Sequence, residues 1–301
     1  MTPAGSSGGT ICPSGGSMEW FRRPAVAGRF YPGRERELRS EVEELLAAAE
    51  EPSGFGTAVV EPDPDFMASE DPEASPPRPK ALIAPHAGYV YSGPVAASGY
   101  APLAALRGSI RRVVLLGPAH RWPFSGVAAS SAAGFDTPLG RAPLDREAIQ
   151  RALQLPQFLI LDEAHEGEHS LEVHLPFLQV ALGEFTLVPL VVGEASLEEV
   201  AEVLRLLWAG PETLVIVSSD LSHYLPYSEA IELDAQTARA IEDLRPEEIR
   251  EDQACGRIPL GGLLLVAREK GLRVQRVDLR NSGDTAGPRN QVVGYGSFLL
   301  G

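Results

Sequence analysis

The side chains of this 301-residue chain that could carry chemistry are its six histidines, together with a few aspartates and one internal cysteine. Three histidines, His86, His120 and His223, each follow a short apolar run by a few residues. Ligands of open α/β sheets bind beyond the carboxyl ends of the strands. If the apolar runs are strands of one sheet, the three histidines belong to one shared polar site.

Two neutral imidazoles and one anionic ligand form a site that binds a transition metal and leaves positions open for a substrate. Asp220 and Cys255 are both candidates for the anionic ligand. Cys255 directly precedes a predicted helix, and the helix N-terminus together with Arg257 is expected to lower the thiol pKa. His223 is the candidate proton donor or acceptor, because imidazole titrates near neutral pH.

The other three histidines lie in A-H-E-G-E-H-S-L-E-V-H-L-P (164–176), where residues 165–169 match the H-E-x-x-H pattern of zinc proteases. That pattern places both histidines on one face of a helix, with the glutamate beside them as general base. Gly167 at its centre costs about 1 kcal/mol in a helix relative to alanine. Pro176 stops a helix from continuing far downstream. A zinc hydrolase is therefore kept only as a minor alternative.

The pattern of apolar residues predicts the strands and helices that position these side chains. Short apolar runs alternate with helical patterns, which indicates an α/β/α sandwich around a central, mostly buried sheet. The predicted strands are residues 81–84, 113–116, 187–192, 214–217, 274–279 and 292–300. The predicted helices are residues 34–51, 95–106, 146–155, 197–208, 231–244 and 260–270.

Two segments lack such patterns. Residues 1–18, rich in glycine and serine, are predicted to be a disordered tail, and Met18 is a second candidate start beside Met1. Residues 52–79, rich in proline and acidic residues, are predicted to be a mobile surface loop. The remainder, residues 19–301, is predicted to form a single α/β domain.

Composition restricts the partners and the compartment. With 26 Lys and Arg against 41 Asp and Glu, the formal net charge is −15, and a field of that sign disfavours nucleic acid and anionic membranes. No run of 18 apolar residues is present to span a bilayer. Two cysteines, Cys12 and Cys255, cannot build a disulfide framework, which favours the reducing cytoplasm.

Six sequence blocks together resemble the Memo family, whose prokaryotic members are called AmmeMemoRadiSam system protein B. With the C-terminal G-Y-G-S (294–297), they span nearly the whole chain, and their number and order make the resemblance specific. The blocks are P-A-V-A-G-R-F-Y-P (24–32), A-P-H-A-G-Y-V-Y-S-G (84–93), L-G-P-A-H (116–120), E-H-S-L-E-V-H-L-P (168–176), S-S-D-L-S-H (218–223) and A-C-G (254–256).

The resemblance implies a fold like that of the catalytic subunit of class III extradiol dioxygenases, which are non-haem iron enzymes. It also implies a metal site of two histidines and a cysteine, which correspond to His86, His120 and Cys255. Asp220 and His223 correspond to the aspartate and histidine of the family's S-S-D-x-x-H block, with His223 as the acid/base residue. The implied cofactor is iron(II), with copper as the alternative, because a thiolate is a soft ligand.

The block at 168–176 overlaps only the second half of the H-E-x-x-H match. The letters shared with the family are those of residues 168–170, 172 and 174, so the first half of the H-E-x-x-H match falls outside it. His169, Glu172 and His174 are therefore expected near the pocket, where they would tie together the loops around the metal.

Two hypotheses about function stay open. In the first, the chain is a cytoplasmic metalloprotein that performs redox or oxygen-dependent chemistry on an unknown small molecule; the cysteine argues against ordinary ring cleavage, because the dioxygenases have a glutamate there. In the second, it is a non-catalytic metal- or peptide-binding partner of AMMECR-like and radical-SAM proteins. The chain departs from the eukaryotic members at Ala119 and Arg121, so the phosphotyrosine-peptide binding ascribed to them is not carried over.

Overall fold

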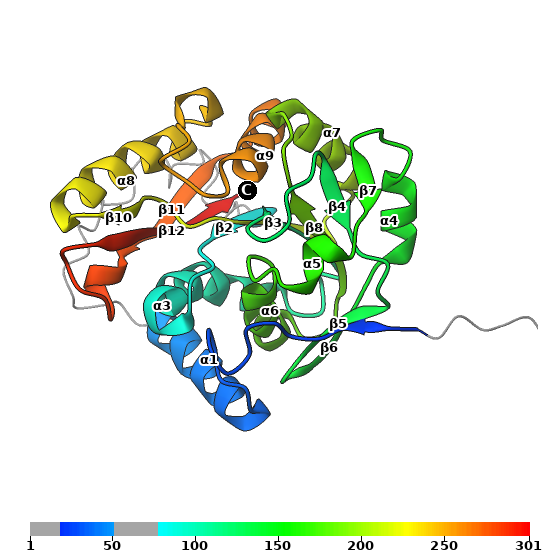
Figure 1. Ribbon diagram of the computed structural model, residues 1–301, viewed down its shortest axis with the longest axis horizontal. Helices are drawn as coiled ribbons and strands as arrows, with labels where there is room; N and C mark the ends of the chain where they lie inside the picture. Colours follow the sequence, from blue (N-terminus) through cyan, green and yellow to red (C-terminus); the bar gives the residue numbers. More distant parts are fainter. Residues whose placement is uncertain (1–18, 51–77) are drawn as a thin grey trace, which may run out of the picture.

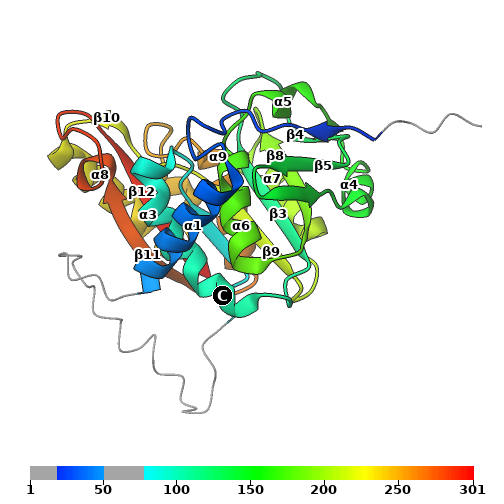
Figure 2. The same ribbon diagram turned by 90° about the horizontal axis from the view of Figure 1, so that it is seen from below.

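The computed structural model describes residues 19–50 and 78–301 of the chain. Within these ranges, a nine-stranded mixed sheet forms the centre and helices cover both of its faces (Figures 1 and 2). This confirms the predicted α/β sandwich with a central, mostly buried sheet. The predicted tail 1–18 and residues 52–77 of the predicted acidic loop lie outside the described residues.

Four parallel strands form the middle of the sheet. Their sequences are almost continuous runs of valine, leucine and isoleucine, as expected for strands that are covered on both faces. The register pairs Ala84 with Ser218 and Leu116 with Val217, so the carboxyl ends of three neighbouring strands lie close to level. In spatial order the four are β2 (Ala81–Ala84), β9 (Thr213–Ser218), β3 (Arg112–Pro118) and β8 (Thr186–Val192).

Shorter and antiparallel strands extend the sheet on both sides. On one side, β12 (Val292–Leu300) runs antiparallel to β2 and also pairs with β11 (Val274–Asn281) and β10 (His223–Leu225). On the other side, β4 (Val127–Ala129) runs antiparallel to β8 and parallel to β7 (Phe158–Ile160). A separate small sheet contains β1 (Phe21–Arg22), β5 (Gly134–Thr137) and β6 (Gly140–Pro143).

The helices form one layer on each side of the sheet (Figures 1 and 2). One layer contains α1 (Glu35–Glu50), α3 (Tyr89–Tyr100) and α6 (Leu175–Leu182), and the other α7 (Leu197–Leu207), α8 (Tyr227–Glu242) and α9 (Arg257–Glu269). Short helices occupy the connections. They are α4 (Arg146–Ala152), α5 (Glu163–Glu166) and the 3₁₀ turns η1 (Ala101–Leu106), η2 (Glu172–His174), η3 (Pro246–Glu248) and η4 (Ser282–Asp284).

Several predicted helix boundaries were wrong, and prolines account for much of the difference. The helix predicted at 95–106 begins at Tyr89, contains Pro94 and gives way to a 3₁₀ turn that starts around Pro102. Helix α8 begins directly after Pro226, and α9 holds Pro259 in its first turn, where a missing N–H costs nothing. Both helices therefore start several residues before the apolar periodicity becomes visible.

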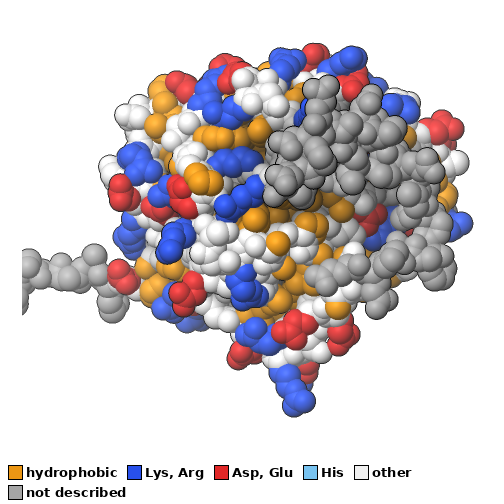
Figure 3. Space-filling view, turned by 180° about the vertical axis from the view of Figure 1, so that it is seen from behind, with side chains coloured by type: hydrophobic (Ala, Val, Ile, Leu, Met, Phe, Trp, Pro, Cys, Tyr) orange, Lys and Arg blue, Asp and Glu red, His pale blue; other side chains and the backbone are white. Residues whose placement is uncertain are grey.

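The surface carries charges of both signs. On the face seen in Figure 3, acidic and basic side chains are interspersed with apolar ones over the described residues. No helix in the described part of the chain is both long and apolar enough to cross a membrane.

Candidate metal site

The carboxyl edge of the parallel strands brings the predicted residues together. His86, Asp220 and His120 each follow the last residue of their strand, β2, β9 or β3, by two positions. Because these three strands are neighbours in the sheet, the loops that follow them meet. The ring centroids of His86 and His120 are 5.2 Å apart.

The hydrogen bonds around His86 determine which of its nitrogens is free. Its Nδ1 lies 2.6 Å from Ser218 Oγ, and the Ser218 hydroxyl donates to the carbonyl oxygen of Ser170 at 2.6 Å. Because that hydroxyl proton is already used, Ser218 Oγ accepts from His86 Nδ1–H. The lone pair of His86 is therefore on Nε2. Complete burial lowers the pKa of the ring well below its ordinary value, so the ring is neutral.

His120 is held in the same tautomer by a carboxylate. Its Nδ1 lies 2.9 Å from Glu168 Oε1, and its backbone N–H donates to Glu168 Oε2 at 2.6 Å. Burial opposes ionisation of Glu168, but the hydrogen bonds from His120 and from the Ser170 N–H outweigh it and lower the pKa to about 2. Glu168 is thus a carboxylate that accepts from Nδ1–H, as carboxylates behind metal-binding histidines do. The Nε2 of His120 is left free.

His169 completes a cluster with these two residues. Its ring stacks on that of His120 with centroids 4.8 Å apart and lies edge-on to His86 at 5.6 Å. One ring nitrogen from each of His86, His120 and His169 lies within 4.8 Å of the other two, and we call these residues the histidine cluster. Burial lowers the pKa of His169 to about 4, so its lone pair is available at neutral pH. The sequence placed His169 only in the pocket wall, and its block of shared letters was the signal for its position.

Cys255 lies beside the cluster. Its Sγ is 3.4 Å from His86 Nε2. The residue lies just before the start of α9, and this position before a helix is the one that the sequence predicted. A Cβ at the next residue, Gly256, would stand 2.5 Å from the carbonyl oxygen of Ser218, so the close approach of this loop to β9 requires glycine. The prediction of a lowered thiol pKa was wrong. Burial, and then the nearby Asp220, raise the pKa of Cys255 to about 12, because these two effects outweigh the hydrogen bonds to the sulfur that lower it.

Asp220 connects two of the loops. Its Oδ1 accepts from the His86 N–H at 2.7 Å, and its carbonyl oxygen accepts from the Cys255 N–H at 3.3 Å. Burial raises the pKa of Asp220 to about 7. The structure therefore gives Asp220 a positioning role toward His86 and Cys255, and shows no hydrogen bond between its carboxyl group and His223.

His223 stands at the start of β10 and is only partly buried. Its Nδ1–H donates to the carbonyl oxygen of Leu221 at 2.8 Å, which leaves the lone pair on Nε2. Burial lowers the pKa of the ring, and nearby His120 lowers it further. His223 is therefore a neutral imidazole with one free acceptor nitrogen close to the cluster.

Glu172 and His174 lie in the same segment as His169 but make other contacts. The buried Glu172 accepts from the backbone N–H groups of Ala25 at 2.7 Å and Val26 at 2.9 Å and from the Tyr31 hydroxyl at 2.6 Å. It also forms an ion pair with buried Arg22. Glu172 thus anchors the N-terminal segment to the histidine-bearing loop.

His174 is buried as deeply as His165 of the same segment. It is 1% exposed, and its Nδ1 lies 2.8 Å from the hydroxyl of Tyr100 in α3. Burial lowers its pKa to about 3. His174 is not part of the histidine cluster, and its contacts hold η2 against α3.

The zinc-protease pattern does not form a site. Helix α5 contains only Glu163–Glu166, so the two histidines of the pattern do not share a helical face. His165 is buried beside Phe135, with its Nε2 3.0 Å from the carbonyl oxygen of Ala128, and Glu166 is exposed. His169 joins His86 and His120 in place of His165.

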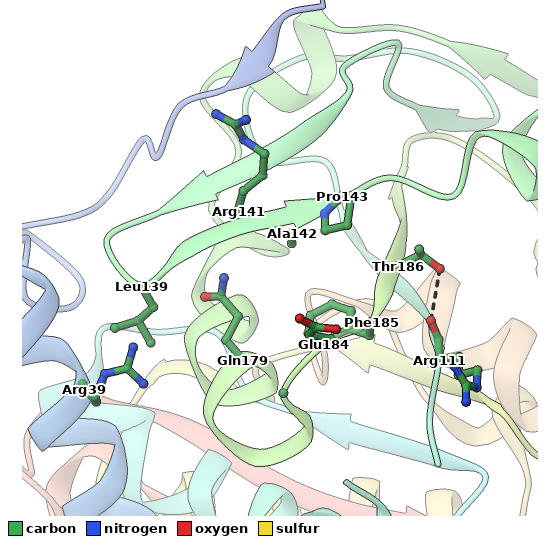
Figure 4. A pocket seen from close by; sticks show the side chains of 11 residues that line it. Arg39, Arg111, Leu139, Arg141, Ala142, Pro143, Gln179, Glu184, Phe185 and Thr186 are labelled. Carbon is green, nitrogen blue, oxygen red and sulfur yellow. Dashed lines mark hydrogen bonds between the residues drawn. The ribbon is translucent and has the colours of Figure 1, made fainter. Parts of the chain in front are cut away.

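A pocket of about 640 Å³ lies elsewhere, at the amino ends of β3 and β8 (Figure 4). Arg39, Arg111 and Arg141 line it. They do not converge: the Arg141 guanidinium packs over the Phe21 ring at 3.3 Å and points away from the cavity. This pocket is remote from the histidine cluster and gathers no comparable set of reactive groups.

Comparison of the sequence with known proteins shows the family to which this chain belongs. The model of the family described as "Memo-like protein" matches residues 22–299. The chain belongs to the Memo family. A "MEMO1 family protein" of Sulfolobus acidocaldarius is 35% identical over 294 residues, which cover 93% of this chain and 99% of that protein. Another, of Ignicoccus hospitalis, is 36% identical over 91% of this chain and 96% of its own length.

A third Memo family relative, from Thermotoga maritima, is 34% identical over 93% of this chain and 99% of its own length. Among solved structures, an uncharacterised protein from Escherichia coli aligns with a TM-score of 0.49 and 15% identity over 74% of this chain and 100% of that chain. The assignment to the Memo family rests on the sequence matches.

Proposed function

We propose that this Memo family protein binds a redox-active metal ion, iron(II) or alternatively copper, and uses it in redox or oxygen-dependent chemistry on a small molecule. The observation that carries the proposal is the arrangement of His86 and His120. Each ring donates its Nδ1–H to an oxygen of the protein and keeps the Nε2 lone pair free. These hydrogen bonds hold both rings in the tautomer that a metal ion requires.

The third ligand in the proposal is Cys255. Its sulfur lies 3.4 Å from the free nitrogen of His86, and a bound metal ion would displace the thiol proton to give a thiolate, which with two imidazoles suits iron or copper. His169 is the competing third ligand, because its ring nitrogen already lies within 4.8 Å of those of His86 and His120. A site of three imidazoles would also accept zinc.

A bound iron or copper ion would supply electron transfer or oxygen activation. The protein's own residues supply the rest. Asp220 holds the backbone at His86 and Cys255 in place through its carboxylate and its carbonyl oxygen. His223 offers a free Nε2 that accepts a proton from a substrate held beside the cluster.

Metal analysis of protein purified without oxygen tests the proposal. We expect close to one iron or copper per chain, with loss in His86→Ala and His120→Ala and retention in His165→Ala, a buried histidine outside the cluster. Loss in Cys255→Ser but not in His169→Gln supports the thiolate ligand, and the reverse supports three imidazoles. Wild-type protein without metal, or His86→Ala with its full complement, refutes the proposal.

Catalysis requires a separate test, because a site does not establish turnover. We expect metal-loaded protein to consume oxygen in the presence of a substrate, and His223→Gln to slow consumption while keeping its metal. Metal-loaded protein that stays silent across candidate substrates would favour the non-catalytic alternative, a metal- or peptide-binding partner protein.

A further inference from the structure

Three buried tyrosines lie side by side in the core below the histidine cluster. Tyr31 precedes α1, and Tyr89 and Tyr100 are the first and last residues of α3; their exposed fractions are 4%, 3% and 0%. The rings of Tyr31 and Tyr89 have centroids 5.5 Å apart. Phe177 of α6 lies 4.8 Å from Tyr89 and 5.1 Å from Tyr100. These four rings form a continuous series of contacts, and we call them the aromatic row.

Two hydroxyls of the aromatic row bond to groups that can take up a proton. Tyr31 donates to the Glu172 carboxylate at 2.6 Å. Tyr100 lies 2.8 Å from His174 Nδ1, and burial lowers the pKa of that ring to about 3, so the imidazole is neutral. Among the described residues, Nε2 of His174 has no partner. The ring and the phenol therefore leave one group unpaired if Tyr100 donates, but two if Nδ1–H donates, so Tyr100 is the donor.

Packing alone does not account for these hydroxyls. A phenylalanine at each position would fill the same space and leave no buried polar group that needs a partner. The hydroxyl of Tyr89 donates to the carbonyl oxygen of Val173 at 2.6 Å, and a backbone carbonyl does not take up a proton. The acceptors of Tyr31 and Tyr100 do, so both phenols can lose a proton at the moment when they lose an electron.

The aromatic row begins next to the histidine cluster. The ring of Phe30, the residue before Tyr31, lies edge-on to the ring of His169 with centroids 4.9 Å apart. The carbonyl oxygen of Phe30 accepts from the Tyr89 N–H at 2.7 Å, and Tyr89 follows His86 by three positions. The first two tyrosines of the row are therefore joined to the cluster through a single aromatic residue and a short stretch of backbone.

We propose that the aromatic row supplies single electrons to the metal centre after dioxygen or a peroxide has oxidised it. The inference deepens the proposed function and rests on it. One electron leaves the phenol of Tyr31 for the oxidised metal centre, the phenol O–H bond breaks, and the proton binds to the Glu172 carboxylate. At Tyr100 the proton binds to His174 Nδ1 instead. The metal centre is reduced by one electron and a neutral tyrosyl radical remains, so oxidising equivalents leave the metal ligands.

Electron paramagnetic resonance tests this role. The full-length protein is loaded without oxygen with iron(II), or with copper(I) if iron does not bind, freed of unbound metal, mixed with hydrogen peroxide and rapidly frozen. We expect a tyrosyl radical signal that narrows when the protein contains ring-deuterated tyrosine. Tyr31→Phe combined with Tyr100→Phe should abolish the signal. Tyr227→Phe is the matched control, because its hydroxyl also donates to a carboxylate, that of Asp284, but its ring is not part of the row; it should keep the signal.

The melting temperature of each variant shows whether it is folded. A full signal in the folded double variant, or loss of the signal in Tyr227→Phe, overturns the proposal. If the double variant does not fold, the single variants Tyr31→Phe and Tyr100→Phe decide, and an undiminished signal in both overturns it. The metal content of the same samples keeps the two proposals apart. Protein that binds neither metal refutes the proposed function and the role of the row with it, whereas bound metal without a tyrosyl signal refutes the role of the row alone.

Discussion

Asp234 in α8 offers the sharpest test of the electrostatics of this fold. The side chain is 3% exposed, and its Oδ1 accepts from the N–H of Ser222, the residue before His223. No ion-pair partner lies near it among the described residues. Burial raises its pKa from the ordinary 3.8 to about 6, with only the Ser222 hydrogen bonds opposing. We predict that Asp234→Asn stabilises the protein at neutral pH.

The size and sign of the effect follow from that shift. Below pH 3.8 the carboxyl group is protonated in both the folded and the unfolded state, so it costs nothing. As the pH rises toward 6, the unfolded state ionises first and the folded state loses stability. A shift of about two units corresponds to about 3 kcal/mol of unfolding free energy above pH 6. Asparagine cannot ionise and still accepts from the Ser222 N–H, so it removes this cost.

The measurement is the free energy of unfolding of wild type and Asp234→Asn by denaturant titration between pH 3.5 and 7. The difference between the variant and wild type should increase with pH by up to about 3 kcal/mol. Asp145→Asn is a control of opposite sign. Burial opposes ionisation of Asp145, but hydrogen bonds from the Ala148 N–H and from Arg112 outweigh it and lower the pKa. A constant difference for Asp234→Asn across this range would refute the reasoning.

Three further predictions concern the frame of the site. Glu172→Gln leaves buried Arg22 without its carboxylate and should lower the free energy of unfolding by about 3–5 kcal/mol, measured by denaturant titration; a loss under 1 kcal/mol would contradict this. Glu168→Gln should weaken metal binding about 10–100-fold in a competition titration with a chelator, and an unchanged affinity would show that the carboxylate behind His120 does not matter. Gly256→Ala should lose metal and about 1–3 kcal/mol of stability because of the clash with β9. Gly167→Ala should change neither, because its Cβ would meet only the Arg121 side chain, at 4.0 Å.

The sequence predicted the fold best where the chain is buried on both faces. The strands at 81–84 and 292–300 have the predicted boundaries, because a covered strand shows as a run with no charged residue between more polar segments. Strands β1, β5 and β6 were missed, since two to four residues are too few to show a period. Their pairing depends on tertiary contact between the N-terminal segment and the chain around residue 135.

The site was predictable in part for a related reason. Parallel strands end at a common edge, so the placement of His86 and His120 followed from their positions after two strands. His169 follows no strand, and its ring reaches the cluster from an irregular segment whose path the sequence does not specify. The pKa of Cys255 was predicted in the wrong direction because its proximity to a helix N-terminus is visible in the sequence, whereas the depth of its burial is not.

The distance along the chain between His86 and Cys255 has a consequence for how the protein would acquire its metal. The two residues are 169 positions apart and meet only when β2, β9 and the start of α9 are in place. A chain still being synthesised cannot present this ligand pair until more than four-fifths of its residues are made. Metal uptake at this pair would therefore be a late event that reports completed folding, and a truncated chain that keeps only one of the two could not bind metal through the pair.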